Sequence, residues 1–116
     1  MGLRLVEDQR IDAVAGGADI VDRRLHGPEL RGALLGGADL FHADLAGADL
    51  REARLNGTFF NGADLKGANL TQADLTGSLL DDTTQIDEKW KLVWQILNQG
   101  ATGRDLSRAD LSGAYL

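Results

Sequence analysis

A chain of 116 residues with a mixed apolar and charged composition has the size of a single domain. The absence of cysteine excludes disulfides, thiolate catalysis and metal sites ligated by cysteine. A net charge of -6 disfavours direct binding to nucleic-acid phosphates and permits a basic partner.

The chain carries no signal for insertion into a membrane or for secretion. No apolar run approaches the roughly 20 residues needed to span a bilayer. Residues 1–10 lack the apolar segment of a secretory signal and already contain Glu7 and Asp8. We therefore expect a cytoplasmic protein that does not associate with membranes.

Residues 1–17 form an irregular start, with apolar residues that follow no clear period. We expect them to form an N-terminal cap or a degenerate first repeat, because the terminal units of repeat proteins are usually atypical.

From Ala18 the sequence repeats every five residues, and this main repeat region extends to Leu80. Residues 38–50 are the clearest run, with three consecutive copies of Ala-Asp-Leu followed by two variable residues, the last copy ending at its leucine. A period of five fits neither a helix nor a simple strand. It indicates a repeat architecture in which each short unit stacks on others.

One large apolar residue marks the centre of each unit, and these central residues are the predicted core. Two residues earlier the side chain is mostly alanine, and two residues later it is often glycine. Glycine relieves the backbone at corners, and Asp or Asn suits turns because its side chain bonds nearby backbone groups. The predicted core comprises Ile20, Leu25, Leu30, Leu35, Leu40, Leu45, Leu50, Leu55, Phe60, Leu65, Leu70 and Leu75.

The repeated Ala-Asp/Asn-Leu units resemble the pentapeptide-repeat family over residues 18–80 and again over 103–116. The resemblance implies an all-β solenoid, a right-handed quadrilateral parallel β-helix in which four pentapeptides form one coil. Residues 20 apart would then stack at about 4.8 Å, the usual spacing between strands.

This rule places one apolar set on the outside of the solenoid. Val21, Phe41, Phe59 and Leu79 all fall on the outer side of the face built on Ile20, Leu40, Phe60 and Leu80. Clustered exposed apolar groups usually mark a surface that something else covers.

Residues 81–102 interrupt the repeat. Residues 81–84 predict a turn, and residues 87–99 predict a helix with acidic residues in its first turn and Gly100 at its end. Ile86, Trp90, Val93, Trp94 and Leu97 form one apolar stripe at helical spacing. The stripe either packs on the solenoid of the same chain or binds a partner. The segment also resembles an insertion found in cyanobacterial members of the family.

Residues 103–116 resume the repeat, with Leu106, Leu111 and Leu116 as centres. An uncapped end would leave a sheet edge open to another chain, so a homodimer through the C-terminal region is a further expectation. In this interpretation residues 1–116 form one pentapeptide-repeat domain.

The sequence offers no catalytic constellation. His26 and His42 fall on different faces, and no phosphate-binding loop is present, so we expect no enzyme activity, no cofactor and no metal. Stacked acids such as Asp44 with Asp64 would either bind cations or imitate phosphates, or else serve only the turns.

The expected function is therefore that of a non-enzymatic solenoid that binds a protein partner. The candidate interaction surface comprises Phe41, Phe59, Leu79, Trp90 and Trp94. The alternative, suggested by family members that imitate DNA, is an inhibitor or modulator of DNA gyrase. Acidity and rod shape support that alternative, and the short rod and modest charge oppose it.

Overall fold

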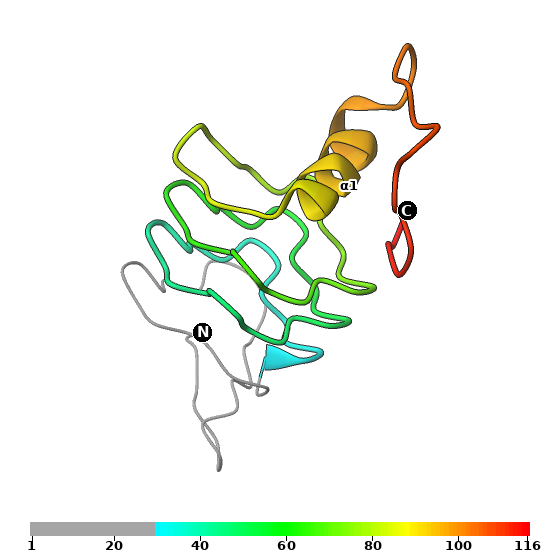
Figure 1. Cartoon of the computed structure of the whole chain (residues 1–116). Coiled ribbons are helices and arrows are strands. Elements are labelled where there is room, and N and C mark those ends of the chain that lie inside the picture. Colours follow the sequence, from blue (N-terminus) through cyan, green and yellow to red (C-terminus); the bar gives the residue numbers. More distant parts are fainter. Residues whose placement is uncertain (1–29) are drawn as a thin grey trace.

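The computed structural model describes residues 30–116. The predicted N-terminal cap over 1–17, the core positions Ile20 and Leu25, and the residues Val21 and His26 lie outside the described residues. From Leu30 the chain winds into stacked coils, and one helix, α1 (Glu88–Gln99), lies at their C-terminal end (Figure 1).

Parallel bridges join successive coils between residues 20 positions apart, such as Leu34 with Arg54 and Arg54 with Asp74. The N–H of Leu35 donates to the carbonyl of Arg54, and the N–H of Arg54 donates to the carbonyl of Ala33, both at 2.9 Å. A corner follows every fifth residue, so only one residue per side forms a bridge. Within residues 30–116 the coils therefore contain isolated bridges and no longer strand. Four pentapeptides per coil make a four-sided parallel β-helix.

Each corner follows a central residue. At the first described corner the N–H of Ala33 donates to the carbonyl of Leu30 at 3.0 Å, and Gly32 between them has a φ of 72°. A positive φ at the third residue of such a turn is the geometry of a type II turn, which favours glycine. His42, Glu52 and Gln72 adopt φ values of 60°, 62° and 58° at equivalent corners. The ladder therefore imposes the corner even where glycine is absent.

The lumen is filled by the central residues and by the small residues two positions before them, and none of them is more than 5% exposed. Fully burying one leucine stabilises a fold by about 1.5–3 kcal/mol, so the stacked centres support a narrow core. The buried lumen residues are Leu30, Ala33, Leu35, Ala38, Leu40, Ala43, Leu45, Ala48, Leu50, Ala53, Leu55, Thr58, Phe60, Ala63, Leu65, Ala68, Leu70, Ala73, Leu75 and Ser78.

The two polar residues among these small positions bond to backbone carbonyls. The Thr58 hydroxyl donates to the Leu35 carbonyl at 2.7 Å, and the Ser78 hydroxyl donates to the Leu75 carbonyl at 2.8 Å. A buried hydroxyl without a partner would cost free energy, so these bonds let Thr and Ser replace Ala.

The repeat register continues past Leu80 with one added residue. Asp64 bridges Gln85 rather than residue 84, and the N–H of Leu65 donates to the Gln85 carbonyl. Thr84 takes the small inward position, since its hydroxyl donates to the Phe60 carbonyl at 2.8 Å. Ile86, which we expected on the helical stripe, precedes α1 and packs on the core. The reason is the longer turn over residues 81–84, which returns the chain to register above Leu65.

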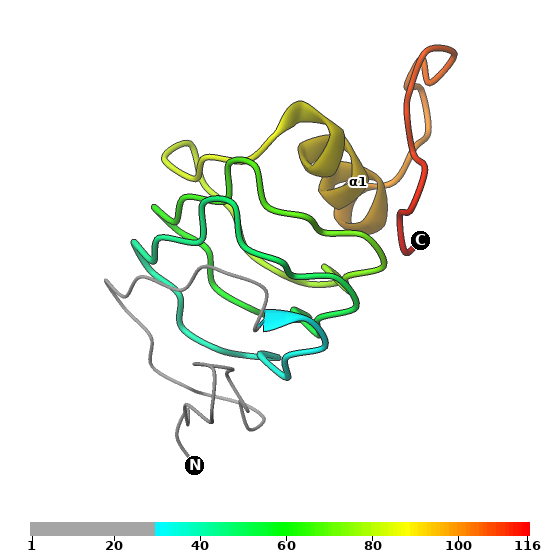
Figure 2. The same ribbon diagram turned by 60° about the horizontal axis from the view of Figure 1, so that its bottom comes forward.

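Helix α1 packs across the end of the lumen, as both views show (Figures 1 and 2). It agrees with the predicted helix within one residue, because Asp87 is its N-cap and Gly100, with a φ of 83°, ends it. Trp90 and Val93 are buried against the core, and Trp94 and Leu97 are partly buried there. The stripe therefore packs on the solenoid of its own chain.

The corner N–H groups of the last coil would be unpaired at this end, and each has a substitute acceptor. The N–H of Gly67 donates to the Asp87 carboxylate at 3.1 Å, and that of Gly77 donates to the side-chain oxygen of Asn98 at 2.6 Å. The N–H of Gln72 donates to the Gly113 carbonyl at 2.7 Å, and the N–H of Gly62 bonds the Asp81 carboxylate. The 81–84 turn, α1 with its N-cap, and the C-terminal segment thus replace the missing coil.

The C-terminal segment, residues 101–116, keeps the local turns of the repeat without rejoining the ladder by bridges. The N–H of Ala109 donates to the Leu106 carbonyl at 3.0 Å, as at the other corners. Leu111 and Ala114 pack on the core, whereas Leu116 is 60% exposed. The segment runs beside α1 (Figure 1). The expected return to the repeat therefore holds for the local geometry and only in part for the stacking.

Replacing Leu50 with Asp should prevent stable folding, because the carboxylate would enter the lumen without a partner and cost several kcal/mol. Asp44→Ala removes an outward carboxylate that accepts the N–H of Ala46 at 3.1 Å. Its expected cost is smaller, about 1 kcal/mol. Urea unfolding followed by circular dichroism measures both. Equal tolerance of the two changes would show that the inward and outward positions are wrongly assigned.

Replacing Asn98 with Ala should lower the free energy of unfolding by about 1–3 kcal/mol, because the Gly77 N–H loses its acceptor. The Asn98 amide also donates to the Leu75 and Trp94 carbonyls, at 3.3 and 2.9 Å. Lys91→Ala, on the exposed side of α1, is the matched control and should be nearly neutral. Thermal melts that do not separate the two variants would mean that α1 contributes little to closing the solenoid.

Candidate interaction surfaces

The residue before each centre points outward, and there Asp or Asn builds the corner that follows. Its side-chain oxygen accepts the N–H two residues ahead, as Asp49 does from Arg51 at 3.1 Å and Asp74 does from Thr76 at 3.0 Å. This bond satisfies a turn that would otherwise rely on water. The stacked acids therefore have a structural use. The residues that accept in this way are Asp39, Asp44, Asp49, Asp64, Asn69, Asp74, Asp81, Asp105 and Asp110.

Several of the remaining outward positions carry apolar residues, and two of these stack on one face. Phe59 bridges Leu79 in the coil above and Asp39 in the coil below. Phe41, just after a centre in the lower coil, places its ring edge-on to Phe59, with centroids 6.2 Å apart. Phe41, Phe59 and Leu79 are 38%, 37% and 48% exposed. We call these three residues the apolar face.

The two tryptophans that the sequence analysis grouped with this face lie differently. Trp90 is 7% exposed and lies on the side of α1 that packs on the coils, so its side chain closes the end of the lumen. Trp94 is partly buried, and its indole N–H donates to the Ser78 carbonyl at 2.9 Å. Since Ser78 precedes Leu79, Trp94 borders the apolar face. The structure thus brings Phe41, Phe59 and Leu79 together, places Trp94 at their edge and buries Trp90.

Acidic groups flank the apolar face. Asp39 lies next to Phe59 in the ladder, and Asp81 and Asp82 follow Leu79 at the next corner. The hydroxyl of Thr83, donating to Asp81 at 2.6 Å, and the Asn61 amide, donating to it at 3.3 Å, hold the pKa of that carboxyl well below its usual value. These bonds therefore stabilise the charged form of Asp81.

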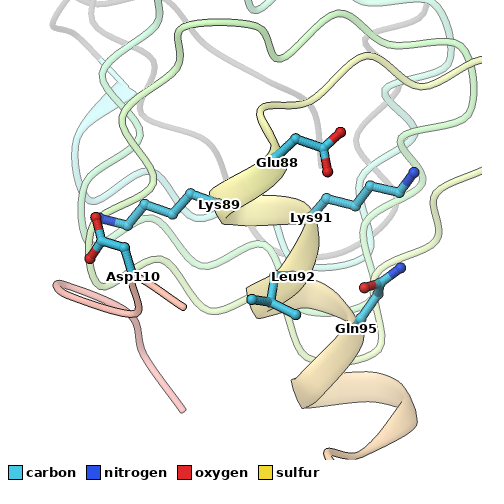
Figure 3. A pocket seen from close by; sticks show the side chains of 6 residues that line it. All are labelled: Glu88, Lys89, Lys91, Leu92, Gln95 and Asp110. Atoms are coloured by element: carbon cyan, nitrogen blue, oxygen red, sulfur yellow. The ribbon is translucent and has the colours of Figure 1, made fainter. Parts of the chain in front are cut away.

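A groove lies between α1 and the C-terminal segment (Figure 3). It has a volume of about 480 Å³, and Figure 3 shows Lys89 reaching toward Asp110 across it. The Lys89 ammonium lies 3.6 Å from the Asp110 carboxylate, 3.1 Å from the Ser112 hydroxyl and 4.8 Å from the centre of the Trp90 ring. The lysine thus ties the C-terminal segment to the helix. The groove is lined by Glu88, Lys89, Lys91, Leu92, Gln95 and Asp110.

Charged side chains elsewhere form local pairs. Arg51 bonds Asp49 at 2.6 Å, which lowers the pKa of Asp49, and Arg31 bonds Glu52 at 2.9 Å. Within residues 30–116, no group of three or more His, Asp or Glu side chains is placed to hold a metal. The only helix that the described chain contains, α1, is too short and too polar to cross a bilayer.

The structure also exposes large apolar side chains that the sequence analysis did not single out. Leu34 is 44% exposed at the outward position of the neighbouring face, and Tyr115 is 46% exposed near the end of the chain. The sequence could have predicted the exposure of Leu34, because this leucine replaces the Asp or Asn that most units carry at that outward position.

Comparisons with known proteins agree with this architecture. The family model described as pentapeptide repeats matches residues 24–57 and 43–82. A solved structure of a pentapeptide repeat protein, Rfr23 from the cyanobacterium Cyanothece 51142, is 37% identical, with a TM-score of 0.59. The match covers 60% of this chain and 48% of that one.

A second solved structure is that of HetL, a pentapeptide repeat protein involved in heterocyst differentiation regulation from the cyanobacterium Nostoc sp. strain PCC 7120. It is 27% identical over 72% of this chain and 42% of that one, with a TM-score of 0.31. The chain thus spans less than half the length of either protein. A search of curated proteins finds no match.

The matched stretches run together from residue 24 to residue 82, about half of the chain, and they contain the same coils that the bridges define. Members of the family fold as right-handed β-helices, which agrees with the parallel coils described above. The chain belongs to the pentapeptide-repeat family.

Proposed function

We propose that this chain is a non-enzymatic interaction protein whose apolar face, Phe41, Phe59 and Leu79, binds a protein partner. The observation that carries the proposal is the stacking of Phe59 on Leu79 at outward positions where most units carry Asp or Asn. These side chains build no corner and fill no part of the lumen, so the fold gives no reason for their apolar character.

The apolar face has the properties of a recognition surface. Aromatic side chains lose little conformational entropy on binding and are enriched at the centre of protein interfaces. Ladder bonds hold the backbone at Phe59 to the coils on both sides and the backbone at Leu79 to the coil below, so the face is rigid before a partner arrives. A preformed surface lowers the ordering cost of association. Pentapeptide-repeat proteins often mediate protein interactions, which also supports the proposal.

The C-terminal segment is a second proposed contact, for a homodimer. Its Tyr115 and Leu116 are 46% and 60% exposed, and its units keep the repeat geometry without bridges to the coil below. A second copy that stacked on this segment would cover them. Light scattering on the purified protein tests this proposal, since a monomer at all accessible concentrations would rule it out.

Imitation of DNA toward gyrase has no supporting observation here. Many outward carboxylates build corners, and Arg51 and Arg31 pair with Asp49 and Glu52. Lys66 lies on a further side of the coil. The described surface is therefore mixed in charge rather than a continuous negative stripe.

Site-specific photocrosslinking in the cells that carry this protein tests the apolar face. A photoreactive phenylalanine analogue at position 59 or 79 should give a discrete adduct with one protein. The same analogue at Leu34 or Arg54, which are also exposed but lie on the neighbouring side of the coil, should not. Identical adducts from all four positions, or none from 59 and 79, would refute the assignment of the face.

A further inference from the structure

We infer that the partner segment is basic, with apolar side chains flanked by lysine or arginine. This inference rests on the proposed function of the apolar face and specifies the chemistry of its partner. It follows from what surrounds Phe41, Phe59 and Leu79 rather than from those residues themselves.

The apolar part of the face is narrow and runs along the solenoid axis. Phe59 and Leu79 are neighbours in one ladder, and the Phe41 ring extends the apolar surface toward the coil below. Two coil spacings amount to about 10 Å, so a short segment of a partner covers the face. Trp94 borders the upper end through its bond to Ser78. The side chains of the partner segment that extend beyond the apolar face must therefore lie over the acidic groups around it, Asp39, Asp81 and Asp82. We call these three acids the rim.

The rim is acidic, and no cation among the described residues neutralises its charges. Within residues 30–116, Asp39, Asp81 and Asp82 form no ion pair. The groups that bond Asp39 and Asp81 are backbone N–H groups, two hydroxyls and an amide, all uncharged.

Three other acids among the described residues do have cations beside them, since Asp49 pairs with Arg51, Glu52 with Arg31 and Asp110 with Lys89, whereas no described cation pairs with the rim acids. The rim acids thus remain available to cations from outside.

Other titratable groups near the apolar face do not cancel the negative charge of the rim. His42 follows Phe41, and its ring lies against Gly62. Arg54 lies one pentapeptide before Phe59, on the preceding side of the coil. A partner that buries apolar side chains on this face brings its flanking groups within a Debye length of the rim, about 8 Å at physiological salt. Lysine and arginine are attracted there, and Asp and Glu are repelled.

The test uses the full chain and two synthetic peptides with leucine at the same positions, one with lysine and one with glutamate between the leucines. Anisotropy of a labelled peptide measures affinity. Tryptophan fluorescence reports the place of binding, because Trp94 borders the face and Trp90 is buried. The lysine peptide should bind at least about tenfold more tightly than the glutamate peptide, and added salt should weaken it.

Three variants locate the interaction, with circular dichroism confirming that each is folded. Phe59→Ser combined with Leu79→Ser should abolish binding of the lysine peptide. Asp82→Asn, which removes an exposed carboxylate that holds no described bond, should weaken binding several-fold. Leu34→Ser, which removes an equally exposed leucine from the neighbouring side, should leave affinity unchanged.

The contrary outcomes separate this inference from the proposed function. Equal, face-dependent binding of both peptides would overturn the basic partner and leave the apolar face as a contact surface. Lysine-peptide binding that survives the Phe59 and Leu79 changes would reflect overall negative charge and would also overturn the inference. Failure of both peptides to bind would overturn it too, and the crosslinks from position 59 would then decide the proposed function independently.

Discussion

The spacing of 20 residues between hydrogen-bonded coils is the constraint on which the rest of the structure depends. Along each side, one N–H donates to the coil above and the carbonyl two residues earlier accepts from it, as Leu35 and Ala33 do with Arg54. A shift of one residue would turn Asp into the lumen and Leu toward water. The added residue at the 81–84 turn is tolerated because it lies at a corner and leaves the sides in register.

A solenoid must also end, and the end is where most of the side-chain bonds between distant segments occur. An unpaired coil is a template for another chain. Here α1 covers the lumen with Trp90 and Val93, while Asp87, Asn98 and Gly113 accept N–H groups at three corners. A single helix therefore buries the last apolar layer and supplies polar groups at its margin. The C-terminal segment completes only part of what a further coil would supply.

The positions within each five-residue unit have different structural roles, and this difference bears on function. The central and small residues are committed to the lumen, so variation between units is concentrated in the outward residue before each centre and in the corner residue after it. Most units place Asp or Asn before the centre and use it in the corner. Phe59 and Leu79 depart from that use, and the proposed recognition surface rests on this departure.

The sequence by itself determined the coil, its inward and outward positions and the presence of the helix. The period of five is a local pattern repeated many times, so each copy reinforces the same assignment, and the described core from Leu30 to Leu75 lies inward accordingly. With the coil of four units that the family resemblance implies, it also places Phe41, Phe59 and Leu79 outward on one face.

Only the tertiary structure decided how the chain ends. The burial of Trp90, the bond from Trp94 to Ser78 and the return of Ile86 to register depend on contacts between segments far apart in the chain. An apolar stripe on a helix has the same sequence pattern whether it packs on the solenoid or on another protein. The physical reason is that periodicity specifies which side of an element is apolar, whereas the shape and hydrogen bonds of the surface opposite decide what covers it.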